Sequence, residues 1–230
     1  MAPLKITVTG TSSIFRHPER GILTINVSAR GFAQEVVGKE ATETFKELHQ
    51  LFRDLSAKTE DGEVKPDAAV INFSAGHLRT WTRDTNEERG RQREHRADMN
   101  IQVVFRDFTK MSEVVSSLAW RPNVEISGIN WRLTEDTEKA LGSESRKEAI
   151  RDAINKARDY AEVAGVEVVP VDIQEKATHS MIATKRGRSM DGGLTSSLAG
   201  GATDYESQSL DLTPHQIQFT SAVVVEFMAK

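Results

Sequence analysis

Residues 21–55 read GILTINVSARGFAQEVVGKEATETFKELHQLFRDL, and the spacing of their apolar side chains changes once along the stretch. From Gly21 to Ala29 every second residue is apolar, which is typical of a half-buried strand. From Val37 onward the apolar residues recur every three or four positions, which is typical of an amphipathic helix. Because the apolar face of this helix needs a cover, the stretch predicts a helix packed on a sheet.

The same two periods recur along the rest of the chain. Alternation predicts further strands at 5–12, 69–81, 97–105, 124–133, 166–173 and 217–227. Helical spacing predicts a second helix capped by Asp107 and a third, the longest, at Ser145–Ala164. For the third helix, Ser145 and Glu148 fit a capping box and Gly165 fits a C-terminal stop. Its inner face is small, so we expect it to approach the sheet closely; that face is Ile150, Ala153, Ile154, Ala157, Ala161 and Ala164.

These elements define the predicted fold class, which is α+β. The order is ββα-ββα-βα-ββ, and we expect a mixed, largely antiparallel sheet with three main helices packed on it. Neither internal repeats nor a domain linker interrupts the pattern. The sequence therefore predicts a single domain over residues 1–230.

Composition excludes several classes of protein. The chain has 230 residues, 38 % of them hydrophobic and 28 % charged, and a formal charge of -4, so it is neither disordered by composition nor strongly basic. We therefore expect no nucleic acid partner. No apolar run is long enough for a membrane span or a signal peptide, so we expect a cytoplasmic protein without a membrane span. There is no cysteine, which excludes disulfides and zinc–thiolate sites.

Motifs of known catalytic centres are missing from the sequence. It contains no G-x-S-x-G elbow, no phosphate-binding loop, no G-x-G-x-x-G after a strand and no H-E-x-x-H. The six histidines are scattered without the spacing of metal ligands. We therefore expect a protein that is not an enzyme, with no catalytic residues, no metal and no cofactor.

A charged stretch between two strands is the first candidate for an interaction site. Its arginines, Arg89, Arg91 and Arg93 among them, could bind an acidic partner or a phosphate, and Trp81 at its base could anchor a contact. The alternative is a solvated hairpin tip, with Trp81 simply covering the sheet.

A glycine- and serine-rich segment at about 185–207 is the second candidate. Its composition predicts a flexible loop, because it cannot bury enough apolar surface to fix its own shape. Arg186 precedes Ser189 by three residues, an arrangement that basophilic kinases accept, so Ser189 is a candidate phosphorylation site. So short a motif also occurs by chance.

Two valines interrupt strand faces that should otherwise be polar. Val224 alternates with the predicted core of the closing strand, and Val104 lies among polar residues of an earlier strand. They predict a second apolar patch on the sheet. Either the chain's own loops cover it, or another subunit or partner does.

Three stretches are informative when taken together. The first is Ile6–Thr11, followed by a proline-containing loop and the strand Leu23–Val27; the second is Ile126–Leu133, leading into the alanine-rich helix that ends at Gly165; the third is the alternating strand that closes the chain. In this order and spacing they are similar to the SIMPL family, catalogued as a domain of unknown function. The similarity spans nearly the whole chain.

The resemblance implies an α+β fold and a role in protein interaction, because the eukaryotic member that gives the family its name is a kinase-interacting adaptor in inflammatory signalling. Bacterial relatives are usually exported and linked to the cell envelope or to oxidative stress. We therefore expect a non-enzymatic adaptor or protein-interaction domain, in signalling or stress response. The alternatives are a self-assembling structural oligomer and a small-molecule binder.

Overall fold

The computed structural model describes residues 4–87, 90–182 and 212–230. Within them lie three α-helices and eight β-strands in antiparallel sheets, so the predicted α+β class is confirmed. The strands form two sheets rather than one, and each sheet belongs to a compact unit. Of the described residues, the first unit contains 4–19, 131–182 and 214–230, and the second contains 20–87, 90–130 and 212–213.

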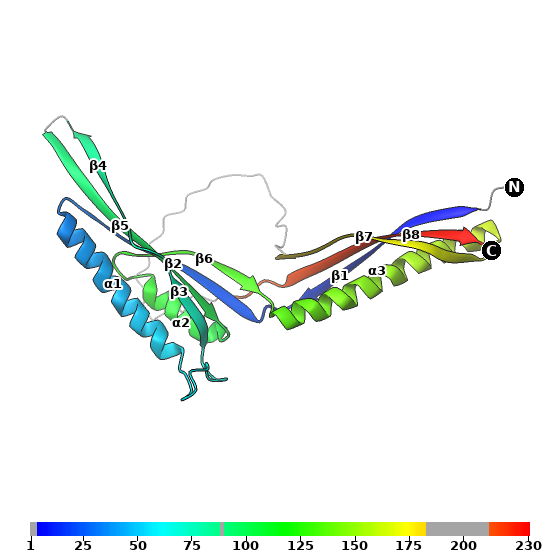
Figure 1. Cartoon of the computed structure of the whole chain (residues 1–230), viewed down its shortest axis with the longest axis horizontal. Coiled ribbons are helices and arrows are strands. Elements are labelled where there is room, and N and C mark those ends of the chain that lie inside the picture. Colours follow the sequence, from blue (N-terminus) through cyan, green and yellow to red (C-terminus); the bar gives the residue numbers. More distant parts are fainter. Residues whose placement is uncertain (1–3, 88–89, 183–211) are drawn as a thin grey trace, which may run out of the picture. The chain divides into compact units, whose positions relative to one another are not determined.

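The first unit is built on a three-stranded sheet with the order β1–β8–β7 (Figure 1). Its strands are β1 (Lys5–Arg16), β8 (Ile217–Ala229) and β7 (Val168–Ile182). The predicted closing strand is confirmed, and it takes the central place in this sheet. β7 is longer than the sequence predicts, and two bulges interrupt its pairing with β8.

Helix α3 (Glu135–Ala164) packs along this sheet through a stripe of small side chains (Figure 1). Ala149, Ala153 and Ala157 are fully buried in a cluster with Val223 and Val225 of β8. The predicted close approach of helix and sheet is confirmed. Ala164 is exposed, contrary to expectation, because the buried stripe ends one turn earlier at Ala161. Gly165 ends the helix in the left-handed conformation, with φ 67°, as predicted.

The predicted start of this helix at Ser145 is wrong. The helix begins ten residues earlier, and Ser145 lies fully buried within it. The N-cap is Thr134, whose side chain accepts a hydrogen bond from the Thr137 N–H. Glu19 fixes this cap from outside the helix, since its carboxylate accepts bonds from the Thr134 N–H at 2.7 Å and from the Thr134 and Thr137 hydroxyls at 2.6 and 2.8 Å.

The second unit is built on a five-stranded sheet. Its strands are β2 (Arg20–Gly31), β3 (Val70–Ala75), β4 (Arg79–Glu87), β5 (Gly90–Phe105) and β6 (Val124–Arg132). The order is β3–β5–β2–β6, and β4 pairs with the remaining length of β5. With α1 (Gln34–Leu55) between β2 and β3 and α2 (Phe108–Leu118) between β5 and β6, this is a split β-α-β arrangement.

One face of this second sheet forms a core with the helices. Leu23, Ile25 and Val27 of β2 are fully buried on it, and Phe105 of β5 meets Phe52 of α1 edge-on at 6.5 Å between ring centroids. The predicted helix after β2 is therefore confirmed. Right-handed crossovers place α2 on the same face as α1. The face with Asn100 and Gln102 carries neither helix, and these side chains are exposed.

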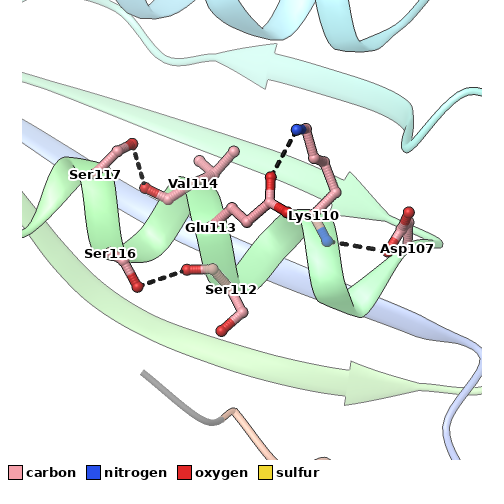
Figure 2. Close-up of polar contacts among 7 residues, drawn as sticks. All are labelled: Asp107, Lys110, Ser112, Glu113, Val114, Ser116 and Ser117. Carbon is pink, nitrogen blue, oxygen red and sulfur yellow. Dashed lines mark hydrogen bonds and ion pairs between the residues drawn. The ribbon is translucent and has the colours of Figure 1, made fainter. Parts of the chain in front are cut away.

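Helix α2 begins where the sequence predicts. The Asp107 side chain caps it by accepting a hydrogen bond from the Lys110 N–H at 3.0 Å (Figure 2). Within the helix the Ser116 and Ser117 hydroxyls donate to the carbonyl oxygens of Ser112 and Val114. In the helix capped in this way, Met111 and Leu118 lie on the buried stripe.

The sequence predicts one strand at 69–81, and this expectation is wrong. The charged stretch Arg83–Arg96 that follows is the end of a hairpin, and its described side chains Arg83, Asp84 and Arg93 are exposed, as expected for a solvated tip. The first stretch divides into β3 and β4, and the Gly76 N–H between them donates to the Asn100 carbonyl at 2.8 Å. Most of the charged stretch is strand, with Arg83 opposite Glu94 and Asp84 opposite Arg93. Both faces of these strand ends are polar, so no apolar alternation marks them in the sequence. The chain order is therefore ββα-βββα-βα-ββ.

Candidate interaction surface

The face of the second sheet opposite α1 and α2 carries an arginine-rich cluster around a tryptophan. The strand register places Trp81 of β4 opposite Arg96 of β5, and Arg96 opposite Arg30 of β2. One step along the strands, Arg79 lies opposite Asp98. Directly opposed residues share one face of a sheet, so these side chains form one surface. We call the group the arginine–tryptophan surface; it comprises Arg30, Arg79, Trp81, Arg83, Arg96 and Asp98.

Three of these side chains are fixed by contacts with one another. The Arg96 guanidinium lies over the Trp81 ring, 5.2 Å from its centroid. Its Nε atom also lies 2.9 Å from Asp98 Oδ2 and 3.0 Å from Oδ1. The Asp98 side chain is only 11 % exposed, so its pairing with Arg96 compensates a charge that would otherwise be costly to bury. Asp98 therefore orients Arg96, and Arg96 supports the tryptophan ring.

The remaining arginines of the surface face solvent. Arg30, Arg79 and Arg83 are exposed, and none of them has an ion pair with a described residue. Trp81 itself is 46 % exposed, which is high for a large aromatic side chain. Asp98 is paired with Arg96, and Glu94 lies on this face opposite Arg83, so Arg30 and Arg79 are the arginines in excess among these residues. The surface can therefore offer cationic donors beside an apolar ring.

The structure brings together only part of the predicted interaction residues. Trp81 is at the centre of the surface. Val104 is on the same face but farther along β5, where it pairs with Ile22. Arg93 is on the opposite face of the β4–β5 hairpin, and its Nε atom lies 3.5 Å from Asp84 Oδ1.

Several predictions fall on parts of the chain that are not described. Arg89, Ser189 and the segment 185–207 lie outside the described residues. The backbone of Arg91 is paired in β5 opposite Asn86, but its side chain is also outside the described part. The predicted phosphorylation site and flexible loop stay predictions.

Val224 belongs to the first unit and does not share a sheet with Val104. Its directly opposed neighbours are Thr9 of β1 and Gln174 of β7, both polar. The idea of one apolar patch on one sheet is therefore wrong. Sequence alternation assigns a residue to a face but does not say which strands become neighbours.

Arg96 belongs to the charged stretch that the sequence singles out, but Arg30, Arg79 and Asp98 were not predicted as part of a site. A signal was available for Asp98, because a carboxylate within the strongly alternating stretch 97–105 suggests a paired charge. The pairing of Asp98 with Arg96 could not be predicted in the same way. Arg30 and Arg79 are far from Arg96 in sequence, and only the strand register places them side by side.

Two hollows lie in the second unit. One of about 50 Å³ lies beside Trp81 and is lined by Val37, Thr82 and His95 among others. The other, of about 350 Å³, is lined by Glu40, Glu43 and Glu47 among others, and Arg121 binds Glu47 at 3.2 Å within it. In the described part of the chain, no group of three or more His, Asp or Glu residues is arranged to hold a metal ion. No helix there is long and apolar enough to cross a membrane.

Comparison with known proteins gives one family. A family model described as SIMPL, protein of unknown function (DUF541), matches residues 6–227. Among curated proteins, none matches the chain. The matched range includes both compact units, so the family pattern is not confined to either one.

Proposed function

Because this chain belongs to the SIMPL family, whose function is unknown, we propose its role from the arginine–tryptophan surface: it is a non-enzymatic domain that binds a protein partner. The observation that carries the proposal is the fixed group of Trp81, Arg96 and Asp98 on a sheet face that neither α1 nor α2 covers. The proposal includes an adaptor role in signalling or stress response, with the partner bound in the cytoplasm.

The physical argument concerns the cost of binding. Tryptophan and arginine are the residues that most often supply binding energy at protein interfaces. A side chain that is already held in place loses less conformational entropy when a partner arrives. Arg96 is held by Asp98 at 2.9 Å and stacks on Trp81, so both are ordered in the free protein. This arrangement is better explained by binding of a partner than by a solvated strand end.

A matched pair of tryptophan variants tests the proposal. Trp120 follows α2 in the same unit and is 89 % exposed, so Trp120→Ala removes an exposed indole of the second unit away from the surface. We expect Trp81→Ala to lose a partner that wild type and Trp120→Ala both capture from cells, with similar melting temperatures for the three proteins. Capture of the same partners by both variants would contradict the proposal.

Self-association is a separate outcome of the same experiment. If the captured partner is a second copy of this chain, sedimentation of the purified protein will show a larger mass for wild type than for Trp81→Ala. Binding of a small molecule at the arginine–tryptophan surface is less favoured, because the hollow beside Trp81 has about 50 Å³, whereas ligand pockets usually enclose about 300 Å³ or more.

A further inference from the structure

The charge of the arginine–tryptophan surface points to the chemistry of the partner. We infer that the surface binds an extended, carboxylate-rich segment of a protein, with Arg30 and Arg79 as the two cationic contacts and Trp81 as the apolar one. This inference rests on the proposed function and names the class of partner.

The two exposed arginines are spaced for such a segment. Arg30 is in β2 and Arg79 is in β4, on either side of β5. Arg30 is opposite Arg96 and Arg79 is opposite Asp98, so their positions along the strand direction differ by two residues. With neighbouring strands about 4.8 Å apart and a rise of about 3.4 Å per residue, their Cα atoms lie about 12 Å apart. Side chains four residues apart in an extended peptide are about 13 Å apart. Acidic residues at positions i and i+4 of one segment can therefore reach both arginines.

The electrostatic arrangement favours carboxylates. Arginine binds a carboxylate through two parallel N–H donors, a geometry that lysine cannot offer. Arg30 and Arg79 have no ion pair with a described residue, so these donors are available. The one buried carboxylate of the surface, Asp98, already has Arg96 as its partner and does not compete for them. Trp81 lies beside Arg79 on β4 and can contact the apolar parts of the bound segment.

Nucleic acid fits the same surface less well. Single-stranded nucleic acid needs several aromatic rings on which successive bases stack, and Trp81 is the one aromatic side chain of this surface.

Fluorescence polarisation with defined peptides tests the inference. The probe is a labelled peptide of about ten glutamates, which spans about 34 Å when extended, and the control probe is the same length of glutamine. We expect the full chain to bind the glutamate peptide saturably and the glutamine peptide not at all. Arg30→Glu combined with Arg79→Glu should weaken the binding at least about tenfold, and raising sodium chloride from about 50 to about 200 mM should also weaken it.

A second double variant controls for net charge. Lys46 and Arg53 are exposed on α1, which covers the other face of the sheet, so Lys46→Glu with Arg53→Glu makes the same change in charge away from the surface. It should bind the glutamate peptide within about twofold of wild type. If the reversed arginines impair folding, as circular dichroism would show, Arg30→Gln with Arg79→Gln replaces them and should still weaken binding.

Three results would overturn the inference: no saturable binding by wild type, equal weakening in both double variants, or tighter binding of an oligodeoxythymidylate of the same length. The proposed function can be judged separately. If Trp81→Ala loses its cellular partner while the arginine variants keep it, the surface binds a protein but not through carboxylates. If Trp81→Ala keeps the partner, the proposed function itself fails.

Discussion

Gly10 of β1 lies directly beneath the carbonyl oxygen of Ala149 in α3. A Cβ atom placed on Gly10 would be 2.0 Å from that oxygen and 2.8 Å from the Cβ of Ala153. No side chain fits in this space, so helix and strand are in contact through their backbones. The contact sets the distance between α3 and the sheet of the first unit.

Gly10→Ala should therefore destabilise the first unit strongly. The atom in the way is backbone oxygen, which cannot rotate aside, so α3 must move away from β1. We expect a loss of about 3 kcal/mol in the free energy of unfolding, at the upper end of overpacking effects. A Cβ atom placed on Gly128 in β6 would have no neighbouring atom within 4 Å, so Gly128→Ala is the control and should change stability by less than about 1 kcal/mol. Equal effects in urea denaturation would contradict this packing.

Ala157→Leu tests the next turns of the same helix. Ala157 is fully buried against the sheet, and a leucine there should cost about 1 to 3 kcal/mol through overpacking. The adjacent Arg158 is exposed, so Arg158→Ala should be tolerated. Chemical denaturation measures both variants, and negligible effects at both positions would mean that the helix is rotated from the phase described.

Ser145→Ala should stabilise the protein slightly. Ser145 is fully buried, and its hydroxyl has no hydrogen-bond partner among the described residues. On the buried stripe of α3 it lies between Leu141 and Ala149, which belong to two different apolar clusters. Removing an unsatisfied buried hydroxyl should gain about 1 kcal/mol. A loss of stability in thermal unfolding would show instead that the hydroxyl is satisfied by a bound water.

Contacts at the free edge of β1 should make the stability of the protein depend on pH. Asp152 of α3 accepts hydrogen bonds from Lys156 Nζ at 2.6 Å and from the Thr11 N–H at 2.8 Å, and these bonds lower the pKa of its carboxyl in the folded protein. A lowered folded-state pKa stabilises the fold above the unfolded pKa, near pH 4, and this contribution is lost as the pH falls through the folded pKa. Lys156 also donates to the Thr9 carbonyl at 3.0 Å, so the two side chains occupy backbone groups that another strand could pair with.

Asp152→Asn should therefore lower the melting temperature at pH 7, and its difference from wild type should shrink below about pH 4. The carboxylate is about one third exposed, so we expect a modest effect of about 0.2 to 1 kcal/mol. Asp159→Asn, at an exposed carboxylate of the same helix, is the control for the loss of one negative charge. A difference that stays constant down to pH 2 would mean that the ionised form of Asp152 does not matter.

Local patterns in the sequence predicted much of the fold. The helix after β2, the Asp107 cap, the Gly165 stop and the closing strand all depend on residues close together in the chain. The first ten residues of α3 escaped prediction because only Leu141 and Gly142 are buried among them, which is too few for an apolar stripe. Two sheets could not be separated from one, because β1 pairs with the last strand of the chain and no local signal records such a pairing.

The candidate surface was predictable only in part for the same reason. Trp81 stands out in the sequence by its type, and it is at the centre of the surface. Its neighbours Arg96, Arg30 and Arg79 come from three strands and are ordinary charged residues until the register aligns them. A buried Asp98 that holds Arg96 depends on that same alignment.

The central claim is that a protein partner docks on the arginine–tryptophan surface, and site-specific photocrosslinking in cells measures this most directly. A photoreactive phenylalanine at Arg83, which is exposed on the surface, should form a covalent adduct with a partner. The same residue at Lys46 on α1 should not form that adduct. An adduct from position 83 that disappears with Trp81→Ala is the predicted result, whereas no adduct from position 83, or the same adduct from position 46, would contradict the account.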